Sequence, residues 1–466
     1  MNIVFLGGGS LRILPIVRGL FETPEVFEGG KISLVDLKLE RAEAVGRLIK
    51  RCPEYRNVNC EVVWTNDLDS ALDGADLFYL TTAIMREPSD TLAMQAAIRH
   101  NFYHSDNLSI NGAFLGARFG ATVMNFARKM ERYCPDAMML DFANPVASFA
   151  GAVTNYTNIK ALGICGGYTN HRWDLSRICG RDEFDTGWEV DSAGVNHLAF
   201  ILRGTYNGRD FHEVMREHIT SDWKAAEITN FDPEFAKVIQ AALGEMVQMY
   251  RRYGTTIFST EGDGIAHVFT DNYIELLTKV LDERLKNFNP DTIEAESMAE
   301  IEKRFADFIA VAASEQDPDW DTPVHQNYIF GNDRGAISVP IIKAMAGIEP
   351  MRIAASHPNN GAVAGFADNA LLEYTMTIDG KTLTPARDLY IPAPFHGLIA
   401  SLSEHQTLLA DAIAQQDGKL FAASLDAYPV HRFTGDRTAF FKEMFEIYSD
   451  LSPAMKDAKN YIDWQA

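Results

Sequence analysis

The amino-acid sequence predicts an α/β protein in which an N-terminal Rossmann-like domain, built on a doubly wound parallel sheet, is followed by a C-terminal α+β domain. Short apolar segments alternate with amphipathic ones from the first residues onward, which is typical of parallel strands joined by crossover helices. Beyond residue 190 this alternation gives way to long helical stretches. At 466 residues the chain also exceeds the usual size of one hydrophobic core. We therefore expect two domains, residues 1–193 and 194–466.

The elements of the first domain follow from hydrophobic periodicity. Short apolar runs indicate buried strands, and apolar residues at helical spacing indicate the helices between them. The expected strands are residues 2–8, 31–36, 60–67, 76–83, 137–145 and 159–165. The expected helices include residues 10–22, 38–52 and 119–133.

The second domain is expected to be mainly helical, with a few strands. Helical periodicity covers residues 233–254, 271–288 and 294–315, and strands are indicated near 371–379 and 382–392. No internal repeat, low-complexity segment or Pro/Gly/Ser-rich linker separates the halves. We therefore expect the two domains to pack closely, with the second supplying substrate-facing loops.

Composition excludes several classes of partner. The net charge is −22 and the sequence pI is about 4.9, so the chain repels a nucleic-acid backbone and an anionic membrane surface. Five scattered cysteines without a CxxC pair indicate neither a disulfide scaffold nor a zinc knuckle. No signal-peptide pattern and no apolar run of about 18 residues or more is present. We expect a reduced cytoplasmic protein without nucleic-acid or membrane partners.

The stretch GGGS follows the first strand directly and can be either a tight turn or a phosphate-binding turn. Between a strand and a helix, such a turn presents backbone N–H groups and a helix N-terminus to a pyrophosphate. Arg12 stands where the usual third glycine would be. Asp36 ends the second strand; as a ribose ligand it favours NAD over NADP, and the alternative is a helix N-cap. The predicted cofactor-binding residues here are Gly7, Gly9, Ser10, Asp36 and Thr82.

Four further stretches carry candidate chemistry: residues 141–151, 161–171, 191–201 and 250–269. Asn144 and Cys165 come at the ends of strands, where ligands of open α/β sheets collect, so we expect them to face one cleft. A Cys and a His from separate loops, with open positions for substrate oxygens, suit a divalent transition metal. The alternatives are a buried small hydrophobe for the Cys, a hydrogen-bonded core residue for the His, and a simple turn for Asn-Pro.

In this order, these stretches resemble glycoside hydrolase family 4, the NAD-dependent glycosidases. FLGGGS and LVDLKLERAE are similar to its cofactor-binding start, FANP to its Asn-Pro motif, LGIC to its metal-binding Cys and AGVNHLAFI to its Asn-His motif. MYRRYG with EGD resembles its Tyr-rich helix and Gly-Asp stretch, and HPNNGAVAGFADNALLE its late segment. The resemblance extends from about residue 2 to 450.

The resemblance implies an unusual glycosidase mechanism, because this family departs from the two-carboxylate scheme. It implies that bound NAD+ takes a hydride from C3 of the sugar and that a divalent metal, usually Mn2+, holds the C2 and C3 oxygens as a Lewis acid. The C2 proton then becomes acidic, a base removes it and the aglycone leaves. Water adds back and NADH returns the hydride.

By the same resemblance, Cys165 and His197 are the metal ligands. Asn144 and Asn196 contact sugar hydroxyls or the nicotinamide end of NAD, so Asn144 counts among both the cofactor-binding and the substrate-binding residues. The family tends toward dimers and tetramers, so a homodimer or homotetramer is expected.

Asp263 is the leading candidate for proton transfer at the C3 hydroxyl or at C2, and Tyr253 is the second. Arg118 falls where family members carry a basic residue, and it is a candidate clamp for a substrate oxygen; a surface Arg at a helix start is the alternative. His267 completes the predicted catalytic set.

Two departures from the family pattern bear on substrate and metal use. Many members carry His or Asp directly after the metal-binding Cys, where this sequence has Gly166 and Gly167. His171, Tyr168 and His267 are candidate substitutes for that helper. The stretch GDGIAHVF likewise lacks the His and Glu that many members carry after Gly-Asp.

These observations predict a glycosidase acting on an unphosphorylated hexoside or hexuronide. One alternative is an NAD-dependent dehydrogenase of the lactate/malate type, which needs a His base paired with a carboxylate and an Arg for the substrate acid. That alternative leaves the Asn-Pro, Cys and Asn-His set without a role. Another alternative is a non-catalytic sensor that binds NAD and sugar.

Overall fold

The computed structural model describes most of the chain. Outside the described residues lie 83–87, 166–167, 183–184, 186, 229–231, 258–261, 287–289, 315, 321–336, 430–435 and 463–466, together with the side chains of 88–91, 168–171, 281–286, 290–298 and 301. Gly166 and Gly167 and the side chains of Tyr168 and His171, named above, therefore lie outside the description.

Twelve strands of the described chain form one sheet, in the order β3-β2-β1-β4-β5-β6-β10-β11-β7-β8-β9 with β12 paired to β11. The first six pair in parallel and are β1 (Ile3–Leu6), β2 (Gly30–Val35), β3 (Cys60–Thr65), β4 (Leu77–Leu80), β5 (Met138–Asp141) and β6 (Lys160–Gly163). The order 3-2-1-4-5-6 is that of dinucleotide-binding sheets, which confirms the predicted Rossmann-like half.

The remaining strands extend the same sheet with antiparallel pairs. They are β7 (Trp188–Val195), β8 (Leu198–Tyr206), β9 (Arg209–Asp210), β10 (Met351–Pro358), β11 (Leu371–Asp379) and β12 (Thr382–Pro385). Strand β10 joins the two parts by pairing with β6 at Ser356 and Gly163. The expected boundary at 193/194 falls within β7, so the two expected domains share one sheet.

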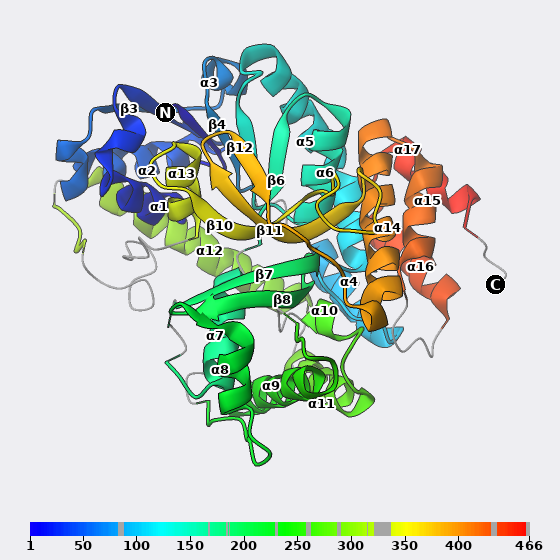
Figure 1. Cartoon of the computed structure of the whole chain (residues 1–466). Helices are drawn as coiled ribbons and strands as arrows, with labels where there is room; N and C mark the ends of the chain where they lie inside the picture. Colours follow the sequence, from blue (N-terminus) through cyan, green and yellow to red (C-terminus); the bar gives the residue numbers. More distant parts are fainter. Residues whose placement is uncertain are drawn as a thin grey trace.

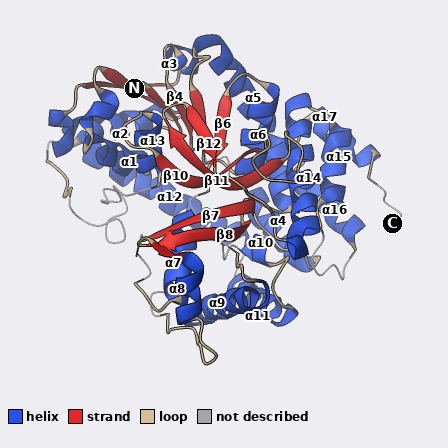
Figure 2. Ribbon diagram, viewed as in Figure 1, coloured by secondary structure: helices blue, strands red, loops and turns tan. Residues whose placement is uncertain are grey.

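Helices cover both faces of the sheet (Figure 2). Those of the first part are α1 (Ile13–Phe21), α2 (Leu39–Arg51), α3 (Leu68–Leu72), α4 (Pro88–Arg99), α5 (Ile110–Tyr133), α6 (Val146–Tyr156) and α7 (Tyr168–Ile178), with the 3₁₀ helices η1 (Pro24–Phe27) and η2 (Pro53–Asn57). Strands β1, β4 and β5 are buried along their whole length, as expected for parallel strands between two helical layers.

The later helices form two groups in Figure 1. The group below β7 and β8 comprises α8 (Phe211–His218), α9 (Pro233–Tyr253), α10 (Gly262–Ile265) and α11 (Asp271–Lys286), and α12 (Pro290–Ala313) leads back to α2. The second group comprises η3 (Ala393–Phe395), α14 (His396–Gln415), α15 (Gly418–Ala427), α16 (Arg437–Ile447), α17 (Pro453–Lys456) and η4 (Asp457–Asn460), whereas α13 (Ser338–Met345) lies apart from both groups, against α1. Helix α14 packs on α5 and α6, so the end of the chain returns to the first part.

Most expected elements differ from the observed ones by a few residues at their ends, and two differ by more. The helix expected at 119–133 begins at Ile110, because Ser109 accepts a hydrogen bond from the Gly112 N–H and caps a helix that starts in a polar segment. The strand expected at 382–392 ends at Pro385, where the chain loses a backbone donor, and Asp388 then takes a positive φ of 50°.

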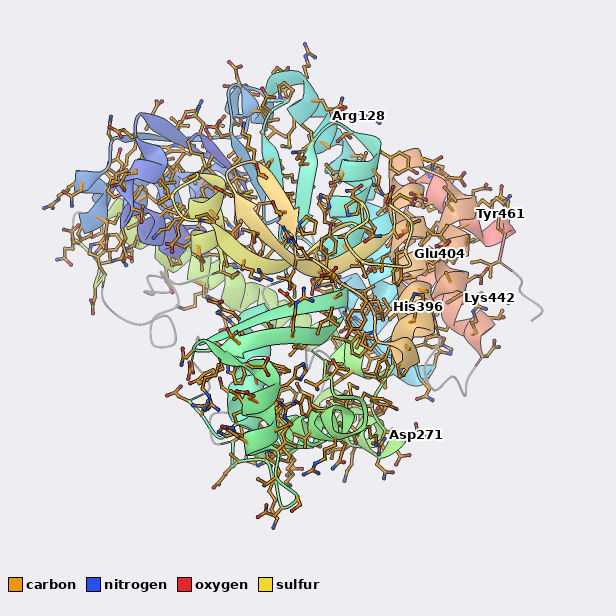
Figure 3. The ribbon with its side chains drawn as sticks, viewed as in Figure 1. Arg128, Asp271, His396, Glu404, Lys442 and Tyr461 are labelled. Atoms are coloured by element: carbon orange, nitrogen blue, oxygen red, sulfur yellow. The ribbon has the colours of Figure 1, made fainter. Side chains whose placement is uncertain are left out.

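Charged side chains lie at the outside of the molecule, and the described helices show no membrane span. Figure 3 places Arg128, Asp271 and Lys442 at the outside of the molecule, away from the sheet. None of the helices in the described part of the chain combines the length and apolar character needed to cross a bilayer.

Candidate active site

The glycine turn lies at the carboxyl end of β1 and is held by backbone contacts. The N–H groups of Gly7 and Gly8 both donate to Val35 O at 2.9 Å, and Gly7 has a φ of +86°. A Cβ on Gly8 would lie 2.6 Å from the Leu34 Cα, so a side chain there would displace β2. The turn therefore brings a glycine-rich backbone and the start of α1 to the carboxyl end of β1, which is where dinucleotide-binding folds hold a pyrophosphate.

Asp36 lies beside this turn at the end of β2. Its Oδ2 accepts from the Gly9 N–H at 3.0 Å and its Oδ1 from the Lys38 N–H at 2.9 Å. Helix α2 begins at Leu39 with Lys38 as its N-cap residue, so the alternative that Asp36 is the N-cap does not hold. The half-buried carboxylate stands where a ribose would lie in a dinucleotide site.

Thr82 completes this edge from β4. A Cβ on Gly7 would lie 3.1 Å from Thr81 O and 3.5 Å from the Thr82 Cα, so the end of β4 adjoins the turn. The Thr82 Oγ1 is buried, and no described group hydrogen-bonds to it. Buried hydroxyls normally have a partner, so this atom suits a ligand lying along the turn. The set of residues fits a dinucleotide.

The next two strand ends bring Asn144 and Cys165 to the same edge of the sheet. Strands β5 and β6 are paired in parallel, Asn144 follows β5 before a cis bond to Pro145, and Cys165 follows β6. Both residues are half-buried. The strand order places both residues at one edge of the sheet, and the expectation that they face one cleft stays a prediction.

Asn196 and His197 form the turn of the β7–β8 hairpin, between the paired residues Val195 and Leu198. His197 has a φ of 68°, which few residues other than glycine and asparagine adopt readily. Both residues are buried, with exposures of 0% for Asn196 and 8% for His197. The hairpin therefore presents an amide and an imidazole inside the protein.

The structure brings Cys165, His197 and Asp263 together. The Cys165 Sγ lies 3.3 Å from the His197 Nε2, and the His197 Nδ1 lies 2.7 Å from the Asp263 Oδ1. Asp263 belongs to the short helix α10, and 66 residues separate it from His197. A histidine that ligates a metal through one ring nitrogen usually has its other ring nitrogen hydrogen-bonded to a carboxylate or a carbonyl. His197 has this arrangement, with Nδ1 toward Asp263 and Nε2 toward Cys165.

Charge inside this cluster shifts the pKa values of His197 and Asp263 in opposite directions. Burial by itself lowers the pKa of His197, but the charges of Asp263 and Cys165 outweigh it and raise that pKa well above its ordinary value. Burial raises the pKa of Asp263, yet His197 and the hydrogen bonds to the carboxylate bring it below its ordinary value. The pair is therefore an imidazolium–carboxylate pair, and a metal at Nε2 would displace a proton.

Asp263 makes four contacts through its two oxygens. Its Oδ1 also accepts from the Gly264 N–H at 3.0 Å, Oδ2 accepts from the Leu108 N–H at 3.1 Å, and the Ser105 side chain donates to the same carboxylate. The exposed fraction of Asp263 is 2%. These contacts fix the carboxylate in place and support a role in orienting His197.

A second polar chain runs from His197 into the sheet. The Asn107 Nδ2 lies 3.2 Å from the His197 Nε2 and also contacts the Asn196 Oδ1. The Asn196 Nδ2 donates to the Glu373 Oε2 at 2.6 Å, where the Ser356 Oγ also lies at 3.4 Å. The Asn107 Oδ1 is buried without a described partner, so it is an acceptor available to a ligand.

The sequence did not single out Asn107 or Glu373 as site residues. Glu373 had a recognisable signal, because it is the one charged residue in the otherwise apolar run LLEYTMTI and is only 3% exposed on the central strand β11. Asn107 had none, since polar residues in a polar connecting segment are ordinary.

Three predicted residues have their described contacts elsewhere. Tyr253 ends α9, is 48% exposed and packs edge-on against Phe395. The His267 Nε2 lies 3.2 Å from the Tyr428 hydroxyl, which donates to Leu108 O. Leu108 in turn contacts Asp263 through its N–H, so these two residues link His267 to Asp263. Arg118 pairs with Asp450 at 2.6 Å. Their predicted roles stay predictions.

Cys165 and His197 fit a divalent metal that takes its remaining ligands from substrate and water. An imidazole nitrogen and a thiolate that share one ion lie roughly 3.1–3.6 Å apart for ligand distances of about 2.1 and 2.3 Å. The observed separation of 3.3 Å lies within that interval. In the described part of the chain, no group of three or more His, Cys, Asp or Glu side chains could hold a metal.

Comparison with known proteins gives one consistent result. A family model described as "Family 4 glycosyl hydrolase" matches residues 2–180, and one described as "Family 4 glycosyl hydrolase C-terminal domain" matches residues 192–426. An alpha-galactosidase from Bacillus subtilis (strain 168) is 22% identical over 468 residues, with 98% of this chain and 100% of that protein covered. An alpha-galacturonidase from Thermoanaerobacter italicus is also 22% identical, with 96% of each chain covered.

Solved structures show the same fold. A 6-phospho-alpha-glucosidase from gut microorganisms, in complex with NAD and Mn2+, matches with a TM-score of 0.74 and 18% identity, with 98% of this chain and 99% of that one covered.

Proposed function

Because this chain belongs to the family 4 glycosyl hydrolases, we propose that it is an NAD-dependent, Mn2+-dependent glycosidase acting on an unphosphorylated hexoside or hexuronide. The observation that carries the proposal is the Cys165–His197 pair, 3.3 Å apart, at the same sheet edge as the glycine turn and Asp36. A dehydrogenase of the lactate/malate type could use the His197–Asp263 pair but has no role for the Cys165 thiol beside it, and this alternative is not favoured.

The proposed cofactors match what the similar 6-phospho-alpha-glucosidase binds, NAD and Mn2+. The turn at Gly7 and Gly9, with Asp36, Ser10 and Thr82, would hold the dinucleotide. Cys165 and His197 would hold the metal. When bound, NAD+ supplies a reversible hydride acceptor for sugar C3, and the metal supplies a Lewis acid at the C2 and C3 oxygens, so that the C2 proton becomes acidic and the aglycone can be eliminated.

The chain's own residues bind and orient the sugar. The Asn107 Oδ1 offers an acceptor for a hydroxyl, and Asn196, held between Asn107 and Glu373, is proposed as a second sugar contact. Asn144, at the end of β5, lies between the dinucleotide turn and Cys165 in strand order and is proposed to reach either ligand. Asp263 holds His197 through Nδ1. Its proton-transfer role, and those of Tyr253 and His267, remain proposals alongside this positioning role.

The substrate class is proposed from the polarity of these groups. The similar proteins include an alpha-galactosidase, an alpha-galacturonidase and a 6-phospho-alpha-glucosidase, so family membership leaves the sugar open. The contacts given for His197 and Asn196 come from amide, carboxylate and thiol groups. Such groups suit sugar hydroxyls, which hexosides and hexuronides share, and none of these described contacts comes from a Lys or Arg that would pair with a phosphate dianion.

The proposal is tested with a panel of aryl α- and β-glycosides, glycosiduronates and 6-phosphoglycosides. Each is incubated with and without NAD+, and with Mn2+ or a chelator, under reducing conditions. We expect aryl alcohol release that needs both NAD+ and Mn2+, without net NADH. Release from the phosphorylated members alone would contradict the proposed substrate class.

Other outcomes separate the alternatives. Net NADH without aryl release would identify a dehydrogenase. NAD binding without turnover on any substrate, unchanged by Cys165→Ser, would identify a sensor. Either result would overturn the proposed glycosidase activity.

The expected setting is reducing, because all five cysteines are free. Cytoplasmic location and a homodimeric or homotetrameric state are proposed on that basis and on family resemblance. Light scattering coupled to size-exclusion chromatography tests the oligomeric state, and a single 51.9 kDa species would contradict it.

A further inference from the structure

One glutamate from a distant helix pairs with both cations that flank the dinucleotide turn. The Glu302 Oε1 lies 3.0 Å from the Lys38 Nζ, and both Glu302 oxygens lie 2.7 Å from the Arg41 Nη2. Glu302 belongs to α12, more than 260 residues after α2. The hydrogen bonds from Arg41 and then Lys38 lower the pKa of Glu302, so it is ionised at neutral pH.

These two cations lie where an additional phosphate on the ribose would be recognised. Lys38 and Arg41 follow Asp36 by two and five residues. A Cβ on Gly9 would lie 2.6 Å from the Arg41 Cβ and 2.9 Å from the Asp36 Oδ2, so Arg41 and Asp36 border the same glycine. In dinucleotide-binding folds, an arginine at this place accommodates the 2′-phosphate of NADP.

The residues beside the proposed ribose site therefore have opposite effects on the binding of a 2′-phosphate. Asp36 disfavours a 2′-phosphate, whereas Arg41 and Lys38 would attract one. With Glu302 in place, the three charges Lys38, Arg41 and Glu302 leave a single net positive charge, and Asp36 offsets it. A 2′-phosphate would have to compete with a carboxylate that already engages the Arg41 guanidinium through both oxygens.

The surrounding contacts hold Glu302 in this position. The Arg41 guanidinium lies over the Phe305 ring, 3.6 Å from its centroid and one turn along α12 from Glu302. The Arg51 Nη1 donates to Ser314 O at 2.8 Å, and the buried Arg18 donates to Trp320 O at 2.8 Å. Contacts at Glu302, Phe305, Ser314 and Trp320 thus hold α12 and the residues after it against α1 and α2. Figure 1 shows α12 beside these helices.

We infer that Glu302 is a cofactor-specificity residue, which occupies Lys38 and Arg41 and thereby makes the site select NAD+ over NADP+. The inference rests on the proposed function, since it takes the glycine turn and Asp36 as a dinucleotide site. It assigns a role in nucleotide selection to α12, which lies outside the N-terminal half that carries the glycine turn.

The test is the affinity of the purified protein for NAD+ and for NADP+, measured by calorimetric titration on wild type and on Glu302→Gln. The amide keeps the size of the side chain and removes its charge. We expect NADP+ to bind Glu302→Gln about three- to tenfold more tightly than it binds wild type, while the NAD+ affinity changes less than twofold. The gain should shrink as salt is raised, since the groups are partly exposed.

Two variants serve as controls. Glu43→Gln removes a carboxylate on α2 that pairs with Arg47 at 2.6 Å, one turn away from the ribose site, and should leave both affinities unchanged. Adding Lys38→Ala and Arg41→Ala to Glu302→Gln should abolish the gain, because both cations that would hold the phosphate are then absent.

The outcomes distinguish this inference from the function on which it rests. Wild type that binds neither nucleotide would overturn the proposed function. Wild type that binds NAD+, together with a Glu302→Gln variant whose NADP+ to NAD+ affinity ratio is unchanged, would overturn the inference alone. Tighter NADP+ binding cannot result from a damaged fold, so loss of stability cannot imitate the expected result.

Discussion

The Asp263 Oδ1 and the His197 Nδ1 lie 2.7 Å apart, buried, and 66 residues apart in the sequence. This contact fixes which ring nitrogen faces Cys165, because the nitrogen that faces the carboxylate keeps its proton. The hairpin turn supplies His197, and α10 supplies Asp263. The orientation of His197 for metal binding therefore depends on how the hairpin turn and α10 pack together.

Asp263→Asn distinguishes a positioning role from proton transfer. If Asp263 orients His197, the variant should bind Mn2+ about 10–100-fold more weakly, as measured by calorimetric titration. If Asp263 acts in proton transfer only, turnover should fall at saturating Mn2+ while the metal affinity stays unchanged. Given the four hydrogen bonds to its carboxylate, we expect the loss of affinity.

Cys165→Ser should abolish specific Mn2+ binding and activity, because a serine hydroxyl is a far weaker ligand than a thiolate. Cys60→Ser is the matched control, since Cys60 is half-buried at the start of β3 and lies away from the carboxyl edge of the sheet. The control should retain wild-type metal affinity. Full metal-dependent activity in Cys165→Ser would remove Cys165 from the ligand set.

Gly264→Ala should disrupt the site, because the added Cβ would lie 1.7 Å from His197 O. His197 or α10 must then move, and we expect a destabilisation of about 1–3 kcal/mol together with loss of activity. Gly244→Ala, in α9 with nothing within 4 Å of its Cβ, should be neutral or slightly stabilising. Thermal unfolding of both variants checks the pair, and equal melting temperatures would contradict the expectation.

Glu373→Gln should lower kcat/KM by about 5–10-fold, because the amide oxygen can still accept from Asn196 but the hydrogen bond loses its charge. The carboxylate accepts from the Asn196 Nδ2 at 2.6 Å and so fixes which end of that amide faces the substrate. The fold should be retained, because the glutamine fills the same volume. Unchanged kinetics would show that Asn196 is oriented without Glu373.

His405 predicts how stability depends on acid. Burial in α14 lowers the pKa of His405 to about 4, and its Nδ1 contacts Ser424 O at 2.8 Å. The unfolded chain protonates this residue below about pH 6.5, but the folded chain does so only below about pH 4, so the folded state loses stability as the pH falls between those values. The loss attributable to His405 reaches about 3 kcal/mol.

The substitution His405→Asn removes the titrating imidazole and keeps a side-chain N–H that can donate to Ser424 O. Its melting temperature should therefore fall less steeply than that of wild type between pH 6.5 and 4, although it is lower at neutral pH. Parallel curves for the two proteins across this interval would exclude His405 as a source of the acid sensitivity.

Local pattern by itself determined the Rossmann-like half. Strands such as β1 and β5 are short apolar runs between amphipathic helices, and the glycine turn and Asp36 lie one after the other in sequence on adjacent strands. These features depend on periodicity and on neighbours within about 40 residues, which a sequence displays directly. The candidates Cys165 and His197 also came from the sequence, through ordered motifs.

Only the tertiary structure decided how those candidates meet. The link between Cys165 and His197 requires β10 and β11 to lie between β6 and β7, and nothing local encodes that strand order. Asn107 and Glu373 became site residues only when the sheet brought them to Asn196. The physical reason is that such contacts gain their energy from burial and pairing across long loops, so they exist only after the whole sheet has formed.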